Sequence, residues 1–194
     1  MRKLLSFMVV TLDGYVAGPN GEFDWPNVDD EFNDFAIRQL DEIDTLLFGR
    51  LGYENMAAYW PTPEARRDDP LVARRMNGVA KIVFSTTLEK ADWENTTLIR
   101  EDAPATVMEL KRRPGQAVAI FGSPDLTVSL LRARLVDEIR VMVHPILLGG
   151  GRSLFDALHE RVPLTHLRTQ TFRSGNVLIS YRPVGPGATG GAPS

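Results

Sequence analysis

The sequence lacks several features that define whole classes of protein. It contains no cysteine, which excludes a disulfide framework, a thiolate metal site and a cysteine nucleophile. Its three histidines, His144, His159 and His166, show no ligand spacing, so we expect no metal site and assign them structural roles. No run of about 18 apolar residues is present, so we expect no membrane partner. The net charge of −3 is atypical of a nucleic-acid-binding surface, so we expect no nucleic-acid partner.

What is present is ordinary for a soluble globular protein. The chain has 194 residues, of which 43% are hydrophobic and 24% charged, and this length suits a single domain. The start, Met1-Arg2-Lys3 followed by apolar residues 4–12, resembles a short signal peptide. However, Ser6 and Thr11 interrupt the apolar run, and Asp13-Gly14 follows where a small-residue cleavage site would stand. We therefore interpret this segment as a first β-strand and expect a cytoplasmic protein.

Apolar runs alternate with segments of helical period along the chain. The predicted strands cover residues 3–11, 45–48, 79–84, 96–99, 117–121 and 138–143, followed by a hairpin of residues 164–172 and 176–182. The predicted helices cover residues 29–44, 50–59, 70–78, 104–113 and 123–135. This order predicts an α/β fold with a mostly parallel sheet, flanked by helices and ending in an antiparallel hairpin. We expect one domain over residues 1–183, and a Gly/Pro-rich tail without a fixed fold over residues 184–194.

Ligands of such sheets bind beyond the carboxyl ends of the strands, so the turns there are the informative segments. Five turns follow predicted strands, and most of them contain glycine or small hydroxyl residues. They are residues 11–14, 49–50, 85–87, 122–124 and 149–151. Glycines, hydroxyls and one arginine suit a cofactor that carries phosphates. The three glycines of the last turn lack the spacing of a Rossmann dinucleotide fingerprint.

The turn Gly122-Ser123-Pro124 is the sharpest local signal. Glycine lets the backbone approach a ligand closely, and free N–H groups in the first turn of the next helix would bind an anion such as pyrophosphate. The alternative is an ordinary strand-to-helix turn in which Ser123 caps the helix.

Two further turns carry phosphate chemistry with equally plain alternatives. Arg50 follows Gly49 at a helix start and suits a phosphate oxygen, but it also stands four residues before Glu54, a spacing that favours a surface ion pair. Ser85 and Thr86 suit a ribose or a 2′-phosphate, but small polar residues also form simple turns.

These turns, in this order, resemble the family of dihydrofolate reductase and of the reductase domain of riboflavin biosynthesis, including its small stand-alone bacterial members. The resemblance covers residues 2–183. The stretches that carry it are VVTLDGYVAGPNGEFDW, LLFGRLGYENM, KIVFSTTL, AIFGSPDLTVSLLRARLVDEIRVMVHPILLGGGRSLF and LTHLRTQTFRSGNVLISY. The resemblance implies a dihydrofolate-reductase-like fold, NADPH as cofactor and a homodimer.

Carried over by position, the resemblance assigns cofactor contacts to twelve residues. The nicotinamide is bordered by Val10 and Thr11 and covered by a mobile loop of residues 13–24 that includes Ala17. The phosphate at the adenosine end is held by Gly49 and Arg50, and the adenine ribose and its 2′-phosphate by Ser85 and Thr86. The pyrophosphate is held by Gly122, Ser123 and the backbone N–H groups through Leu126, a stretch that includes Pro124 and Asp125.

The implied reaction transfers a hydride to a C=N or C=O bond of a pterin- or pyrimidine-like substrate. The candidate catalytic acids are Asp30 and Asp34, one helical turn apart, and Asp13 at the end of the first strand. Acids at a helix N-terminus also favour the helix dipole, and Asp13 also suits a turn with Gly14. The alternative function is an NADPH-binding protein without reductase activity.

Two further observations concern the substrate. Phe121 occupies the position of a glutamate that binds the ribosyl substrate in riboflavin-pathway reductases, which argues against that substrate. Several aromatic residues suit either a pocket for a flat ring or simple core packing. They are Trp25, Phe32, Phe35, Tyr53 and Trp60.

Overall fold

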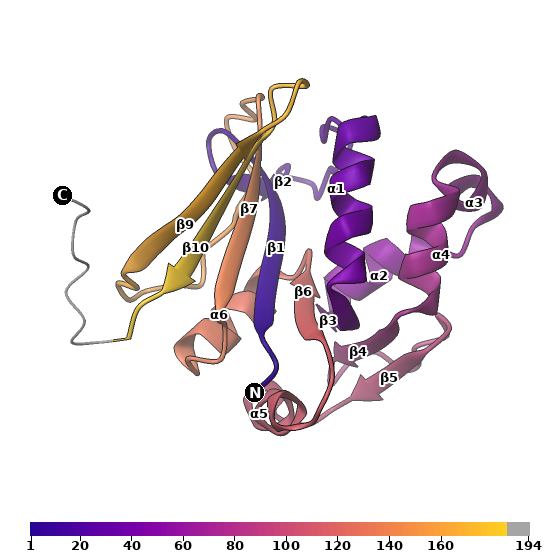
Figure 1. Cartoon of the computed structure of the whole chain (residues 1–194), viewed down its shortest axis with the longest axis vertical. Coiled ribbons are helices and arrows are strands. Elements are labelled where there is room, and N and C mark those ends of the chain that lie inside the picture. The colour runs from indigo at the N-terminus through magenta and orange to yellow at the C-terminus, as the bar shows by residue number, and fades with distance from the viewer. Residues whose placement is uncertain (186–194) are drawn as a thin grey trace.

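In the computed structural model, which describes residues 1–185, an eight-stranded sheet separates two layers of helices (Figure 1). The strand order is β5-β4-β3-β6-β1-β7-β10-β9, and neighbours from β5 to β7 are parallel. β10 runs antiparallel to both of its neighbours, β7 and β9. The strands are β1 (Leu4–Thr11), β3 (Ile43–Gly49), β4 (Ala80–Phe84), β5 (Thr96–Ile99), β6 (Ala117–Phe121), β7 (Glu138–His144), β9 (Leu164–Thr171) and β10 (Val177–Pro183). The predicted α/β fold with a C-terminal antiparallel hairpin is confirmed.

The helices divide between the two faces of the sheet. The first face carries α1 (Asp30–Asp41), α2 (Arg50–Tyr59), α3 (Pro63–Asp68) and α4 (Pro70–Gly78). The second face carries α5 (Ala103–Arg112) and α6 (Pro124–Arg132). Because both faces are covered, the central strands are buried on both sides and their sequences barely alternate.

The first strand shows how this double burial works. Leu5 and Phe7 pack into the core under α1 and α2, whereas Leu4 and Met8 pack into the core under α5 and α6. Ser6, which interrupts the apolar run, is fully buried and shares a hydrogen bond of 3.0 Å between its Oγ and the Oγ1 of Thr127 on α6. The serine is therefore a satisfied polar contact within the core rather than a break in the strand.

The first helix ends earlier than predicted. Asp29 is its N-cap and accepts a hydrogen bond from the Phe32 N–H at 2.8 Å, but the helix ends at Asp41 instead of residue 44. Ile43, which falls within the helix predicted over residues 29–44, begins β3 and pairs with Ala117 of β6. A buried isoleucine fits the apolar period of either element, so the sequence pattern misplaced this boundary.

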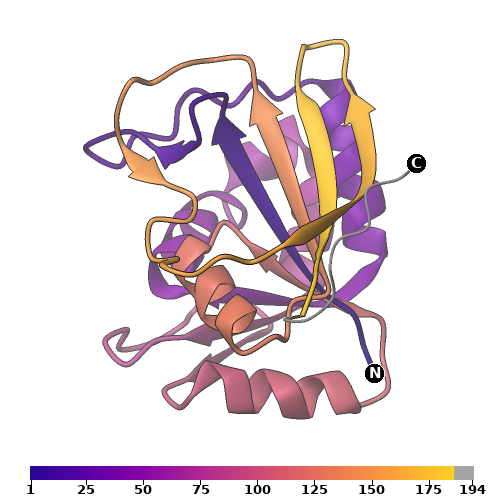
Figure 2. The ribbon, with the colours of Figure 1, turned by 90° about the vertical axis from the view of Figure 1, so that its left-hand side faces the viewer.

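Three short elements were not predicted. β2 (Tyr15–Ala17) and β8 (Arg152–Ser153) form a two-stranded antiparallel sheet beyond the tip of β1 (Figure 2). Strands of three and two residues are too short to show a hydrophobic period. The six-residue α3 begins at Pro63 after Thr62, whose hydroxyl accepts a hydrogen bond from the Ala65 N–H.

The predicted tail of residues 184–194 lies outside the described residues except for positions 184 and 185. Over residues 1–185, no helix combines the length and the apolar character that crossing a membrane requires.

His144 ends β7 and is buried, with 1% of its surface exposed. Its Nδ1 accepts a hydrogen bond from the Asn27 N–H at 3.0 Å, and its ring meets that of Trp25 edge-on at 5.6 Å between centroids. Burial lowers the pKa of His144 below its usual 6.5. The neutral ring thus connects the end of the sheet to the segment that precedes α1.

This geometry predicts a pH dependence of stability. As the pH falls through 6.5, the unfolded chain binds a proton at His144 before the folded chain does, so the free energy of unfolding decreases. We expect wild type to lose up to about 1.4 kcal/mol more than His144→Gln between about pH 7.5 and pH 5.5. Urea denaturation at both pH values measures this difference. The control is His159→Gln at an exposed position, and equal losses for wild type and His144→Gln would contradict the assignment.

Candidate active site

β3 and β6 lie side by side and parallel in the sheet, and the connections that follow them run to opposite faces. The helix that follows β3 is α2 and packs on the first face, whereas the helix that follows β6 is α6 and packs on the second. Ligands of open α/β sheets bind where the connections diverge in this way, beyond the carboxyl ends of the strands. The fold therefore places a ligand site above β3 and β6.

The two strand-to-helix turns at this point contact each other directly. Ser123 Oγ accepts a hydrogen bond from the Gly49 N–H at 3.0 Å and donates one to the Phe121 carbonyl at 3.1 Å. Ser123 stands at the N-cap of α6, but its side chain makes no capping hydrogen bond to that helix. The hydroxyl thus joins the two turns and does not cap α6, unlike in the alternative of an ordinary capping serine.

Two glycines make this close approach possible. Gly122 has a φ of 55°, in the left-handed region that glycine adopts without steric cost. A Cβ on Gly52 would overlap Ser123 Oγ and come within 2.8 Å of the Gly122 carbonyl oxygen. The first turn of α2 consequently lies against the turn that precedes α6, and both helix N-termini face the same region.

A cleft with a volume of about 760 Å³ opens beside these turns, a size typical of small-molecule sites. Its walls come from β1, β2 and the loop after it, α2, the turn before α6, and β8 with the segment that follows. The lining residues are Phe7, Met8, Val9, Val16, Ala17, Gly18, Pro19, Gly21, Phe23, Leu51, Gly52, Asn55, Met56, Phe121, Gly122, Pro124, Gly151, Arg152 and Asp156.

The predicted cofactor residues divide into three groups. Ala17, Gly122 and Pro124 line the cleft. A second group belongs to the joined turns or to the first turn of α6 but does not line the cleft. Its members are Gly49, Arg50, Ser123, Asp125 and Leu126. The remaining predicted residues lie away from the cleft lining and are Val10, Thr11, Ser85 and Thr86.

The side chains of two predicted phosphate ligands already have partners. Arg50 Nη1 lies 3.0 Å from a carboxylate oxygen of Glu54, the surface pair that its spacing favours. Ser85 Oγ accepts hydrogen bonds from the Thr87 and Leu88 N–H groups, so it stabilises its own turn. Arg50 Nη1 would have to leave Glu54 to bind a cofactor phosphate.

Asp13 joins two loops at the end of β1. Its carboxylate accepts hydrogen bonds from Thr11 Oγ1 at 2.5 Å and from the N–H groups of Gly149 at 2.8 Å and Leu148 at 3.1 Å. The Thr11 hydroxyl, together with these backbone amides, lowers the pKa of Asp13. Asp13 is thus ionised near neutral pH and is placed to hold the glycine-rich loop rather than to donate a proton.

Neither acid predicted on the first helix lines the cleft. Asp30 and Asp34 are both exposed, while Asp29 caps the helix. The acid that does line the cleft is Asp156, which the sequence analysis did not select.

The polar residues of the cleft that sequence analysis missed are Asn55, Arg152 and Asp156. Arg152 was detectable, because it follows the three-glycine turn of residues 149–151 directly. Nothing in the local sequence marks Asn55, which lies inside α2. Over residues 1–185, no three histidine, aspartate or glutamate side chains form a group suited to a metal ion.

The apolar lining includes three aromatic residues, Phe7, Phe23 and Phe121. The five aromatic residues considered for this purpose from the sequence do not line the cleft. Phe35 packs against Phe7 in the core at 5.6 Å between centroids, as the core-packing alternative predicts.

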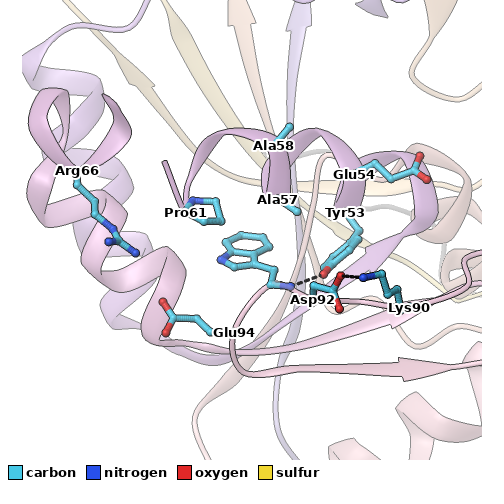
Figure 3. Close-up of a pocket in the computed structure, with 10 residues that line it drawn as sticks. Tyr53, Glu54, Ala57, Ala58, Pro61, Arg66, Lys90, Asp92 and Glu94 are labelled. Carbon is cyan, nitrogen blue, oxygen red and sulfur yellow. Dashed lines mark hydrogen bonds and ion pairs between the residues drawn. The ribbon is translucent and has the colours of Figure 1, made fainter. Parts of the chain in front are cut away.

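A second hollow, of about 620 Å³, lies beside α2 and the segment between β4 and β5 (Figure 3). It contains the Lys90–Asp92 ion pair at 2.6 Å and the hydrogen bond from the Trp93 N–H to Tyr53 Oη at 2.9 Å. None of the predicted cofactor-binding or catalytic residues lines it, although Tyr53, one of the aromatic residues considered from the sequence, does. It also lies away from the joined turns, so we place the site in the cleft.

The parallel sheet with its antiparallel hairpin, and the cleft at the divergence of α2 and α6, define a dihydrofolate-reductase-like α/β protein of the reductase type. Residues 2–178 match the family described as the RibD C-terminal domain, and the chain belongs to this family.

One curated relative and two solved structures are similar to this chain. "Uncharacterized protein YyaP" of Bacillus subtilis (strain 168) is 34% identical over 182 residues, covering 93% of this chain and 94% of that protein. A Shewanella sp. PV-4 protein, provisionally described as a riboflavin biosynthesis protein, matches with a TM-score of 0.71 and 22% identity over 94% of this chain and 99% of its own. Dihydrofolate reductase from Enterococcus faecalis, complexed with NADP(H), matches with a TM-score of 0.62 and 15% identity over 93% and 96%. These two structures establish the shared fold.

The contact between the two turns predicts the effect of a single methyl group. Gly52→Ala places a Cβ against Ser123 Oγ and the Gly122 carbonyl, so we expect a loss of about 1–3 kcal/mol in the free energy of unfolding. Gly78→Ala, at the end of α4 with no atom within 4 Å of the added Cβ, is the matched control. It should be neutral or stabilise by up to about 1 kcal/mol. Urea denaturation of both variants measures this, and an unaffected Gly52→Ala would show that the turns do not pack as described.

Proposed function

We propose that the protein is an NADPH-dependent reductase that transfers a hydride to a C=N or C=O bond of a small pterin- or pyrimidine-like heterocycle. The observation that carries the proposal is the pair of joined strand-to-helix turns at the edge of a largely apolar cleft. From the resemblance to the dihydrofolate reductase family we also propose that the protein is a cytoplasmic homodimer.

The proposed cofactor would contact three parts of this arrangement. The Gly122 turn and the backbone N–H groups of the first turn of α6 would hold the pyrophosphate, since no side chain caps that helix. Ala17, on β2 in the cleft wall, would lie near the nicotinamide. Arg50, once separated from Glu54, would bind a phosphate at the adenosine end, with Ser85 and Thr86 nearby in the family arrangement.

When bound, NADPH supplies the hydride, and the protein supplies alignment and exclusion of water. Phe7, Phe23 and Phe121 give the cleft an apolar surface that suits a flat ring. Phe121 lies in the cleft wall, where a carboxylate would be needed to bind a ribosyl hydroxyl. This supports a substrate without the ribosyl chain of the riboflavin pathway.

The proton that completes the reduction needs a separate source. Asp13 is ionised and bonded to the glycine-rich loop, so it does not suit the role. We retain Asp30 and Asp34 as candidates that act through water, because neither side chain lines the cleft. The same observation favours the alternative function, an NADPH-binding protein of this fold without reductase activity.

Two measurements test the proposal together. Titration with NADPH and NADH, followed by protein fluorescence, measures cofactor binding, and loss of NADPH absorbance with dihydrofolate measures turnover. Preferential NADPH binding with turnover supports the reductase. Binding without turnover of dihydrofolate or of a panel of oxidised pterins and pyrimidines supports the alternative, and binding of neither nucleotide contradicts both.

The role of Arg50 gives a sharper prediction. If its guanidinium binds the 2′-phosphate, Arg50→Gln loses a charge-assisted hydrogen bond and weakens NADPH binding by about 10-fold or more, while NADH binding changes little. The control is Arg67→Gln, which removes an equally charged residue from an exposed ion pair with Asp68. Equal losses for NADPH and NADH in Arg50→Gln would exclude a contact with the 2′-phosphate.

A further inference from the structure

Arg152 is fixed in the cleft wall by backbone contacts. It lies on β8 and pairs with Ala17 of β2, while the next residue, Ser153, pairs with Tyr15. A Cβ on Gly151 would overlap the Ala17 carbonyl oxygen, so only glycine allows β8 to approach β2 this closely. The position of Arg152 relative to the cleft is consequently set by the sheet and not by a free loop.

The charge of Arg152 is paired with a carboxylate from another element, the first turn of α6. Its Nη2 lies 2.5 Å from a carboxylate oxygen of Asp125, in the first turn of α6. The side chain of Arg152 is 33% exposed and that of Asp125 is 74% exposed. An ion pair this exposed to solvent is weak, so another anion can displace the carboxylate.

The Arg152–Asp125 ion pair lies between the cleft lining and the first turn of α6. Asp125 follows Pro124, which lines the cleft together with Gly122 and Arg152. A carboxylate in the first turn of α6 occupies the region where the free N–H groups of that helix attract an anion. Asp125 would therefore repel a bound phosphate, whereas Arg152 would attract it. Asp156 is the other charged residue of the cleft lining, and Arg152 is the one positively charged residue among the lining residues.

We propose that Arg152 exchanges Asp125 for the pyrophosphate of the cofactor, and that Asp125 limits cofactor affinity by competing for the same guanidinium. The arginine fork matches two phosphate oxygens, which favours this exchange. The inference rests on the proposed function and adds to it a phosphate-binding residue from β8.

The two partners of this one ion pair give opposite predictions. Arg152→Gln weakens binding of NADPH and NADH alike by about 10-fold or more, because both carry the pyrophosphate. Asp125→Asn strengthens binding of both by about threefold or more, because it removes the competing carboxylate. Isothermal titration of the full chain with each nucleotide measures the four affinities. The control pair is Arg112→Gln and Glu109→Gln on α5, which form an exposed ion pair outside the cleft lining and should leave both affinities unchanged.

The sign of the Asp125→Asn effect separates this inference from a structural role. If the pair only fastens β8 to α6, both variants break the same contact and weaken binding together, and that result overturns the inference. Unchanged binding in Arg152→Gln overturns it as well, while the proposed function stands as long as wild type binds NADPH. If wild type binds neither nucleotide, the proposed function fails first and this inference fails with it.

Discussion

The hydrogen bond from the Gly49 N–H to Ser123 Oγ is the contact on which the site depends. It joins the ends of two neighbouring parallel strands whose following helices cover opposite faces of the sheet. The N-termini of α2 and α6 lie together because this hydrogen bond joins their turns and because Gly52 has no side chain that would separate them. The buried serine hydroxyl accepts one hydrogen bond and donates another, neither of them to α6, so no side chain caps the first turn of that helix.

A second set of contacts holds the opposite wall of the cleft. Asp13, at the end of β1, binds the backbone of Leu148 and Gly149, and the β2–β8 pairing continues the attachment outward. The segment predicted as a mobile cover of residues 13–24 thus contains a strand paired to β8. Arg152 stands on the same strand, β8.

The sequence was sufficient for the main architecture because buried parallel strands and amphipathic helices leave strong periodic signals. It also located the turns after β3 and β6, because each glycine stands where a buried apolar run gives way to a helical period. The partner of Ser123 could not be predicted, because a capping serine and a bridging serine have the same local sequence. The pairing of β2 with β8 joins segments more than a hundred residues apart, and the Arg152–Asp125 pair joins residues about thirty apart. No local sequence pattern records contacts of this kind. The exposed positions of Asp30 and Asp34 likewise depend on how α1 is placed on the sheet.

The central claim is that the joined turns bind a nicotinamide dinucleotide. The most direct measurement is an NMR titration of the ¹⁵N-labelled protein with NADP⁺, following backbone amide signals. The account predicts the largest shifts at Gly49, Gly122 and Ser123 and in the first turn of α6, with little change at Trp93 in the second hollow. Shifts concentrated around Trp93, or no shifts at saturating NADP⁺, would contradict it.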